Sequence, residues 1–566
     1  MAHQCEASAA FMSHGATTRA LHIPYIVAEI FQCLAPFGGQ VVNIQDFSEE
    51  NWRYSRQCQH ALLQLARVCR AFVDPALDVL YHTMSSLRAL LDILPSFRDG
   101  SHTAPFTIAG GITDAQWARF QEYARRVRIL ELVTPLHCVK LPRIAWDLLE
   151  MRSAGNPLLP CLHTLHFLNV EPEDPVGVTL LLSQTIRHLV LTCSTKRQIA
   201  ANPAFVLMAT SPLPQLHSLR IHGYPYISPR SLNQLPHLNQ LHTLTIAHSG
   251  IIVDYDALRI ISHLTSLEDL TLAVDLSERD LTRPLQLGPG FRALKHLHLC
   301  GIIQEIRAIL LACGRCPRMQ AFGLIIISAL SAEMVINTFA IVQDQLTDAI
   351  TDIQFRILDD LDFSLFSLTD IVEPFFAFPK VDAFLADFAG HIPRMNYDDV
   401  SRLTAAWPSL TSFHFICDQT QPPGFDGALK IEGLAEMARR WPLLDYLHLP
   451  ILDVRTLPSP SDVPRINHKM LADLEVFELR GEETVDIASL AVILDRLFPN
   501  LERPASFKKE ELTRQNPTFT RPLGALDYAR LLMGVITVNR ECEQATGEVD
   551  VACAHPAHLE IEDSPP

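Results

Sequence analysis

The stretch WPLLDYLHL at residues 441–449 carries a phrase that recurs along most of this chain. An apolar residue and a proline are followed by another apolar residue, two spacers and a final apolar-x-apolar triplet. Close copies stand at 159–167 (LPCLHTLHF), 213–221 (LPQLHSLRI), 378–386 (FPKVDAFLA) and 407–415 (WPSLTSFHF). A recurring phrase of this kind predicts a repeat architecture.

Looser copies extend the pattern in both directions. We take the first apolar residue of each final triplet as an anchor. The spacing between anchors then runs from 24 residues (Leu165 to Leu189) to 35 residues (Leu130 to Leu165), near the long end of leucine-rich repeats. The anchors are Leu130, Leu165, Leu189, Leu219, Leu244, Leu270, Leu297, Phe322, Ile353, Phe384, Phe413, Leu447 and Phe477.

Each apolar-x-apolar triplet predicts a short strand with one buried face. Between the anchors, segments such as ALKIEGLAEMARRW and VDIASLAVILDRLF have the apolar spacing of helices. One strand and one helix per repeat predict an α/β fold, a curved leucine-rich-repeat solenoid with parallel strands on the concave face and helices on the convex face. The array resembles irregular leucine-rich repeats, because most copies lack the usual Asn or Cys after the strand.

The N-terminal part has a different, helical pattern. HIPYIVAEIFQCL at 22–34 carries an amphipathic stripe, and LARVCRAFVDPALDVLY at 65–81 predicts two helices. In the second stretch Asp74 is expected as an N-cap and Pro75 as the first residue of a third helix. That helix is expected to continue to a stop at Pro95, which gives a small bundle of three helices.

IPYIVAEIFQCL followed by LLQLARVCRAFVDPALDVLY resembles the F-box, in the form common in fungal F-box proteins. Tyr25 departs from the family, which usually has an acidic residue there. Residues 35–61 form a long insert, predicted to be a surface loop leading into a helix.

The resemblance implies a small N-terminal three-helix F-box that binds a Skp-type adaptor and, through it, a cullin ubiquitin ligase. Some of the apolar residues must also form the bundle's own core, although so small a unit cannot bury all of them internally. The adaptor-binding positions implied by the resemblance are Ile23, Pro24, Ile26, Ile30, Phe31, Leu34, Leu65, Val68, Cys69 and Phe72.

These patterns divide the chain. The expected parts are a disordered N-terminus (1–20), an F-box-like domain (21–95), a connector (96–126), the solenoid (127–505), a C-terminal cap (506–545) and a disordered acidic tail (546–566).

Composition narrows the function classes. With 46 basic and 63 acidic residues the formal net charge is −17, which disfavours a nucleic-acid partner on electrostatic grounds. The first twenty residues lack the pattern of a secretory signal, and the most apolar run, at 321–332, is shorter than the about 20 residues of a membrane span. We therefore expect a protein of the cytoplasm, the nucleus or both, without a membrane partner, whose 13 cysteines are mostly reduced.

Two patterns could carry chemistry. Cys313 and Cys316 in CGRC have the spacing of a redox dithiol or half a zinc site, but Cys316-Pro317 aligns with Trp407-Pro408, so a core position is favoured. His296 and His298 would share a strand face that a metal could bridge. We expect no metal, no cofactor and no catalysis, because none of the common nucleotide-binding, nucleophile or metalloprotease motifs occurs.

The middle residue of the strand triplets is often polar and predicts a ladder along the solvated face. The candidate client-binding ladder comprises His166, Arg220, His298, His414, His448 and Glu478, with the C-terminal members favoured because aromatic residues lie nearby.

The function that these features favour is substrate recognition in an SCF-type (Skp-cullin-F-box) E3 ubiquitin ligase, with an unknown protein client. The alternatives are an interaction scaffold that directs no ubiquitin transfer and an enzyme that uses the histidine ladder.

Overall fold

The computed structural model divides the chain into two compact units. The first comprises Met1–Arg279 and Gln286–Ala293, and the second comprises Asp280–Leu285 and Leu294–Pro566. Within the described residues, none of the helices combines the length and the hydrophobicity needed to cross a membrane. The structure describes residues 24–34, 49–98, 107–108, 110–132, 143–168, 175–193, 213–223, 232, 235–247, 253–277, 281, 283–417, 425–466, 468, 470–481 and 485–501.

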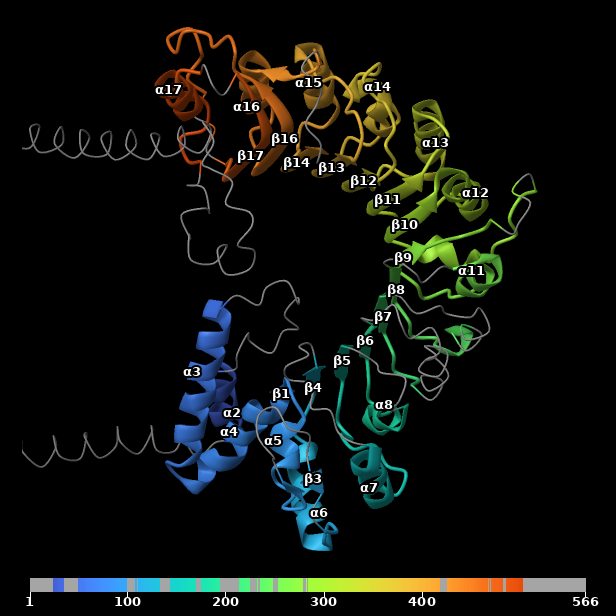
Figure 1. Ribbon diagram of the computed structural model, residues 1–566, viewed down its shortest axis with the longest axis vertical. Coiled ribbons are helices and arrows are strands. Elements are labelled where there is room, and N and C mark those ends of the chain that lie inside the picture. The colour runs from blue at the N-terminus through green and yellow to red at the C-terminus, as the bar shows by residue number, and fades with distance from the viewer. Residues whose placement is uncertain are drawn as a thin grey trace, which may run out of the picture. The chain divides into compact units, whose positions relative to one another are not determined.

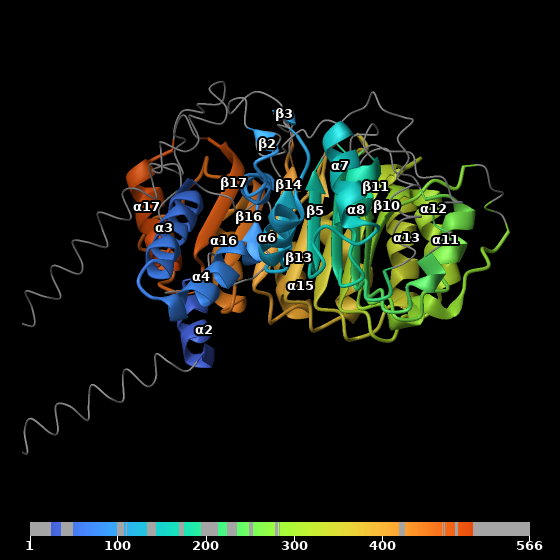
Figure 2. The ribbon, with the colours of Figure 1, turned by 90° about the horizontal axis from the view of Figure 1, so that it is seen from below.

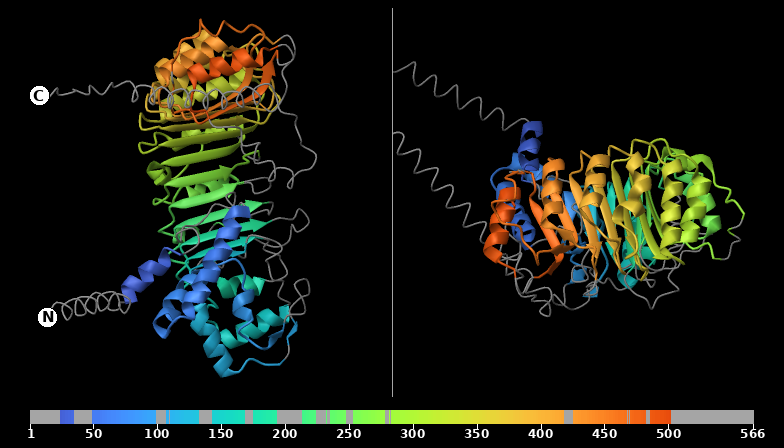
Figure 3. Two further views of the ribbon diagram at one scale, coloured as in Figure 1. Left: turned by 90° about the vertical axis from the view of Figure 1, so that its left-hand side faces the viewer. Right: turned by 90° about the horizontal axis from the view of Figure 1, so that it is seen from above.

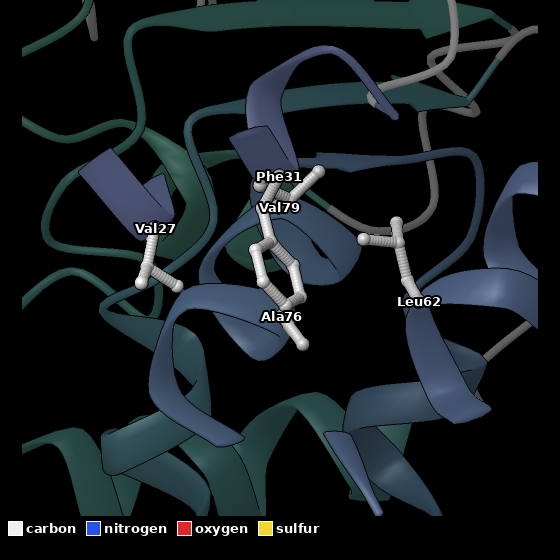
Figure 4. Close-up of a cluster of buried hydrophobic side chains, with 5 residues drawn as sticks. All are labelled: Val27, Phe31, Leu62, Ala76 and Val79. Carbon is white, nitrogen blue, oxygen red and sulfur yellow. The ribbon is translucent and has the colours of Figure 1, made fainter. Parts of the chain in front are cut away.

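The first unit opens with the helices α2 (Pro24–Gln32), α3 (Glu49–Ala66) and α4 (Arg70–His82). Their inward faces form one apolar cluster, which consists of Val27, Phe31, Leu62, Ala76 and Val79 (Figure 4). The ring of Phe31 meets the ring of Phe72 edge to face, with 5.5 Å between centroids. These helices therefore share a core of their own.

The predicted break at Asp74-Pro75 is wrong, because α4 runs through it without interruption. The chain turns earlier, and Cys69, with φ −156°, is the extended residue before α4. A proline inside a helix costs about 3 kcal/mol. Burying side chains such as Val79 contributes about 1.5–3 kcal/mol each. Ala76 and Val79 are buried and Phe72 packs beside them, so the tertiary contacts of this face outweigh the proline signal.

The third helix was also predicted too long. It ends at His82, and the next residues form the strand β1 (Thr83–Met84), which pairs in parallel with β4 (Ile129–Leu132). Because Met84 pairs with Leu130, the repeat sheet begins inside the predicted F-box range. The predicted connector is folded where it is described, with β3 (Thr107–Ile108) antiparallel to β2 (Phe97–Arg98) and with α6 (Asp114–Ala124). Between β1 and β2 lies α5 (Arg88–Leu91).

The sheet of the first unit continues in chain order from β4. Successive strands are parallel, and the predicted anchors pair directly from Leu130 through Leu165, Leu189, Leu219 and Leu244 to Leu270. Each of these leucines is almost completely buried. The further elements are β5 (Thr164–Leu168), β6 (His188–Cys193), β7 (Ser218–Gly223), β8 (Thr243–Ala247), β9 (Asp269–Ala273), α7 (Arg143–Ser153), α8 (Pro175–Leu181), η3 (Leu235–His237), α11 (Tyr255–Ile261) and η4 (Pro289–Ala293).

The second unit repeats the same arrangement with longer helices. Its parallel strands are β10 (His296–Ile302), β11 (Ala321–Ser328), β12 (Asp352–Ile357), β13 (Ala383–Phe388), β14 (Ser412–Cys417), β16 (Tyr446–Asp453) and β17 (Asp473–Arg480), with β15 (Leu429–Lys430) beside β16. The helices are α12 (Ile303–Cys313), α13 (Ala332–Gln345), α14 (Leu368–Val372), η5 (Glu373–Ala377), α15 (Tyr397–Ala406), α16 (Ile431–Arg440) and α17 (Ile487–Leu497).

The helices α12 to α17 all lie on one side of this sheet, along the outside of its bend (Figure 1), and α12 and α13 run next to each other (Figure 2). The strands follow one another like rungs (Figure 3). Strands inside and helices outside make the second unit a leucine-rich-repeat solenoid, as the sequence predicted.

The Trp-Pro phrases place their tryptophans in the core between repeats. Trp407 and Trp441 are completely buried. The indole of Trp441 donates to the carbonyl of Trp407 (2.8 Å), and the indole of Trp407 donates to the carbonyl of Phe375 (3.4 Å). Because a buried indole N–H needs an acceptor, each tryptophan ties its repeat to the preceding one.

The last predicted anchor is wrong by three residues. Leu447 of β16 pairs with Leu474 of β17 and not with Phe477. LEVFEL contains two apolar-x-apolar triplets, and only pairing with β16 decides between them. The predicted cap, the tail, the N-terminus and the beginning of the insert lie outside the described residues.

Candidate functional site

In the helical region, which comprises α2, α3 and α4, the implied adaptor-binding residues differ in burial. Phe31 is 2% exposed and belongs to the core, so it cannot offer its ring to a partner while the bundle is folded. Ile30 is 48% exposed and Val68 is 66% exposed, and Cys69 is exposed as well. These three residues can contact another protein without rearrangement.

The remaining implied residues are intermediate. Leu34, Leu65 and Phe72 are partly buried against the cluster, and Ile26 is half-buried. Pro24 begins α2, and Ile23 lies outside the described residues. Two further apolar residues, Tyr25 and Leu63, are exposed although the sequence analysis did not name them as adaptor-binding positions. The helical spacing could have indicated that Leu63 is exposed, because adjacent residues of a helix point in different directions and Leu62 is on the buried face.

In the first unit the predicted ladder positions align but differ in exposure. His166 lies directly between Glu131 and Val190, and Arg220 follows on β7. Arg220 is exposed, whereas His166 is 8% exposed, with its Nδ1 4.0 Å from Glu131 Oε1. Burial, then Arg220 and His188, lower the pKa of His166 to about 4. His166 is therefore a neutral, buried histidine at pH 7 and not part of a solvated face.

In the second unit, His298 and His414 hold the predicted middle positions. The imidazole of His298 lies over Gly323 of the next strand, where an added Cβ would come within 2.0 Å of its Nδ1. His414 pairs with His448, and their ring centroids are 6.3 Å apart. Burial, followed by the neighbouring His448, lowers the pKa of His414, while Glu475 and Asp473 oppose this.

The structure corrects the last member of the ladder. His448 pairs with Glu475, and its Nδ1 lies 3.2 Å from Glu475 Oε2. Glu478 pairs with Ile451 and lies three residues farther along β17, on the opposite strand face, where its carboxylate accepts from Arg480 Nε (3.2 Å). The ladder therefore ends in Glu475, and Glu478 does not belong to it.

Of the two cysteines in CGRC, Cys316 fills a core position as predicted, at 3% exposure. Burial raises the pKa of the Cys316 thiol to about 11 and that of the Cys313 thiol well above its ordinary value. Thiols with raised pKa values are poor nucleophiles and poor metal ligands at pH 7. Across the part of the chain that the structure describes, no three His, Cys, Asp or Glu side chains are grouped to hold a metal ion.

The chain matches no family model and no curated protein. Among solved structures, it is similar to an internalin from Listeria monocytogenes, with 12% sequence identity over 77% of this chain and 92% of that one. The TM-score of that match is 0.30. The class of the protein follows from its own strand order and register, which are those of a leucine-rich-repeat fold.

Proposed function

We propose that this chain is the substrate-recognition subunit of an SCF-type E3 ubiquitin ligase. Its F-box-like helices would dock a Skp-type adaptor, and through it a cullin, while the repeats bind a protein client. Ubiquitin transfer would be catalysed by partner subunits, in the cytoplasm, the nucleus or both.

The observation that carries the proposal is that the helical region has two sets of apolar residues, one buried in its core and one exposed. Phe31 and Leu62 hold the helices together, while Ile30 of α2 and Val68, in the turn between α3 and α4, remain exposed. Exposed apolar side chains that the fold does not need are favoured at protein interfaces. The F-box resemblance supplies the identity of the partner.

A two-protein pull-down with a purified Skp-type adaptor tests the proposal. We expect the double variant Ile30→Asp, Val68→Asp to lose adaptor binding, because each change would bring a carboxylate into an apolar interface. Its circular dichroism should be unchanged, since both side chains are exposed. Ile144→Asp is the matched control, because Ile144 is 66% exposed on α7, outside the helical region.

Phe31→Ala tests the core of the helical region, whereas the Ile30→Asp, Val68→Asp variant tests its exposed surface. Removal of a buried phenylalanine costs about 3–5 kcal/mol, so this variant should lose adaptor binding together with the stability of the helical region. Undiminished binding by the Ile30→Asp, Val68→Asp variant would refute the adaptor proposal. Adaptor binding without co-purification of a cullin would instead favour the interaction scaffold.

A further inference from the structure

A row of basic side chains crosses the first unit just before its strands begin. Arg128, His163, Arg187, His217 and His242 precede β4 to β8, one for each strand, and we call them the basic row. Each backbone N–H donates to the carbonyl of the preceding member, at 2.7 Å for His163 and Arg187 and 2.8 Å for His217 and His242. These bonds hold neighbouring members at the spacing of paired strands, about 4.8 Å.

The histidines of the row are held in defined orientations. The rings of His217 and His242 are stacked, with 5.4 Å between centroids and 11° between planes. Their Nδ1 atoms lie 2.5 Å from the carbonyl of Gln215 and 2.6 Å from that of Gln240. A carbonyl can only accept, so Nδ1 carries the proton and Nε2 remains to bind a ligand. Once protonated, Nε2 becomes a donor.

The charges around the row are predominantly positive. Burial, then Arg128 and Arg187, lower the pKa of His163. Burial, then His217, Arg187, Arg220 and His163, lower the pKa of His188, the neighbour of Arg187. Burial, then Arg128 and His163, lower the pKa of His82 at the end of α4. Every neighbouring group that shifts these three values acts as a positive charge.

Acidic groups stand at the margins. The ionisable groups on the elements that carry or border the row are His82, Arg125 and Arg126 before β4, Glu131 on β4, His166 on β5, His188 on β6, Arg220 and His222 on β7, and Glu268 and Asp269 at the start of β9. Glu131 is buried, and burial raises its pKa, which disfavours its charged form. Glu268 and Asp269 adjoin the last member, His242, through backbone bonds of 2.8 and 2.9 Å. They limit the positive surface to β4–β8.

We infer that the basic row binds an acidic segment of a partner protein, laid across β4 to β8, and that binding takes up protons. Four spacings between strands give a length of about 19 Å, which corresponds to about six residues of extended chain. Arg128 and Arg187 offer permanent charge and paired donors for carboxylates. Because the positive charge is concentrated in this row, the row can attract an acidic segment although the whole chain has a net charge of −17.

The proton uptake follows from linkage. A bound carboxylate favours the charged imidazolium, so it raises the pKa of His163 above its value in the free protein, where burial and the neighbouring Arg128 and Arg187 lower it. The complex then holds more protons than the free partners, and its affinity must increase as the pH falls. The inference rests on the proposed function only in treating the repeats as a protein-binding surface.

Fluorescence anisotropy of a labelled deca-glutamate peptide on the full chain tests the inference at low salt. We expect the affinity to rise at least about threefold from pH 8 to pH 6, since each bound proton contributes up to tenfold per pH unit. Arg128→Gln, Arg187→Gln should weaken binding at least about tenfold at both pH values. Arg259→Gln, which removes an exposed charge from α11, is the control and should bind like the wild type.

The histidine is tested separately. His163→Gln should keep the affinity at pH 8 and lose most of the increase at pH 6. Wild-type affinity in the arginine variant, or no pH dependence in the wild type, would overturn the inference. Equal or tighter binding of a ten-nucleotide RNA would show a general polyanion surface, which also overturns it. The adaptor variant Ile30→Asp, Val68→Asp should keep its peptide affinity, so this test stands even where the adaptor proposal fails.

Discussion

At the scale of single residues, burial decides which cysteines react. With a pKa of about 11, Cys316 has only about one part in ten thousand as thiolate at pH 7, and the thiolate is the nucleophile. Cys33 and Cys69 are exposed. In native protein treated with iodoacetamide, peptide mapping by mass spectrometry should find Cys33 and Cys69 modified well before Cys316.

The same experiment reports on the adaptor. If the proposed function is correct, a Skp-type adaptor should protect Cys69, and unfolding in guanidinium should expose Cys316 to full reaction. If Cys316 were modified as fast as Cys69 in the folded chain, its core position would be wrong and CGRC would be a reactive motif.

His166 makes a second prediction at this scale. Its pKa is about 4 in the folded chain and about 6.5 when unfolded, so the unfolded chain binds more protons between these values. The contribution of neutral His166 to the free energy of unfolding is therefore fully present above pH 6.5 and decreases as the pH falls toward 4. A shift of this size corresponds to about 3 kcal/mol.

Urea unfolding at pH 7 and pH 4.5 measures this contribution. His166→Asn should lose less stability than the wild type between the two pH values, even though the wild type is more stable at pH 7. His263→Asn, at an exposed histidine, is the control. The assignment of His166 as a buried neutral group fails if wild type and His166→Asn respond equally to pH.

At the scale of elements, the register of β17 can be tested through a neighbouring strand. Glu475 raises the pKa of His414 by its negative charge, although burial and His448 lower it more. Glu475→Gln removes this charge and should lower the pKa of His414 further. Glu478→Gln should leave it unchanged, because Glu478 lies on the other face. An NMR titration of His414 that shows the reverse order would restore Phe477 as the anchor.

At the scale of the whole molecule, one arginine ties the helical region to the first repeats of its unit. Arg126, at the end of α6, bonds to Asp74 (2.7 Å) and to Asp78 of α4. Arg126 is itself mostly covered, but the carboxylates are 75% and 61% exposed. Because these carboxylates can be solvated again, Arg126→Ala should cost about 1 kcal/mol, far less than the rupture of a fully buried pair.

Thermal unfolding and limited proteolysis of α4 measure the loss. Arg152→Ala is the control, because Arg152 also bonds an aspartate, Asp114, at 2.8 Å but lies farther from α4 in the chain and has a fully exposed partner. Equal effects of the two substitutions would mean that the contacts of Arg126 do not hold the helical region in place.

The repeat class and nearly all of the strand anchors could be predicted from local sequence patterns. A buried leucine in an apolar-x-apolar triplet is a local signal that needs no knowledge of the neighbouring strand. The basic row was equally available, because its members all stand two residues before an anchor, and aligning the repeats would have revealed it.

Where a local sequence pattern fits two registers or two types of element, only tertiary contacts select one of them. Pairing with β16 chose Leu474 over Phe477, and pairing with β4 turned Thr83 and Met84 from predicted helix into strand. The packing of Val79 in the core stabilises α4 as one helix that continues through Pro75. Whether an apolar or polar side chain is core, interface or solvated depends on what covers it, and the covering atoms come from residues distant in the chain. That is why Phe31 and His166 could be placed on their elements but not assigned their surroundings.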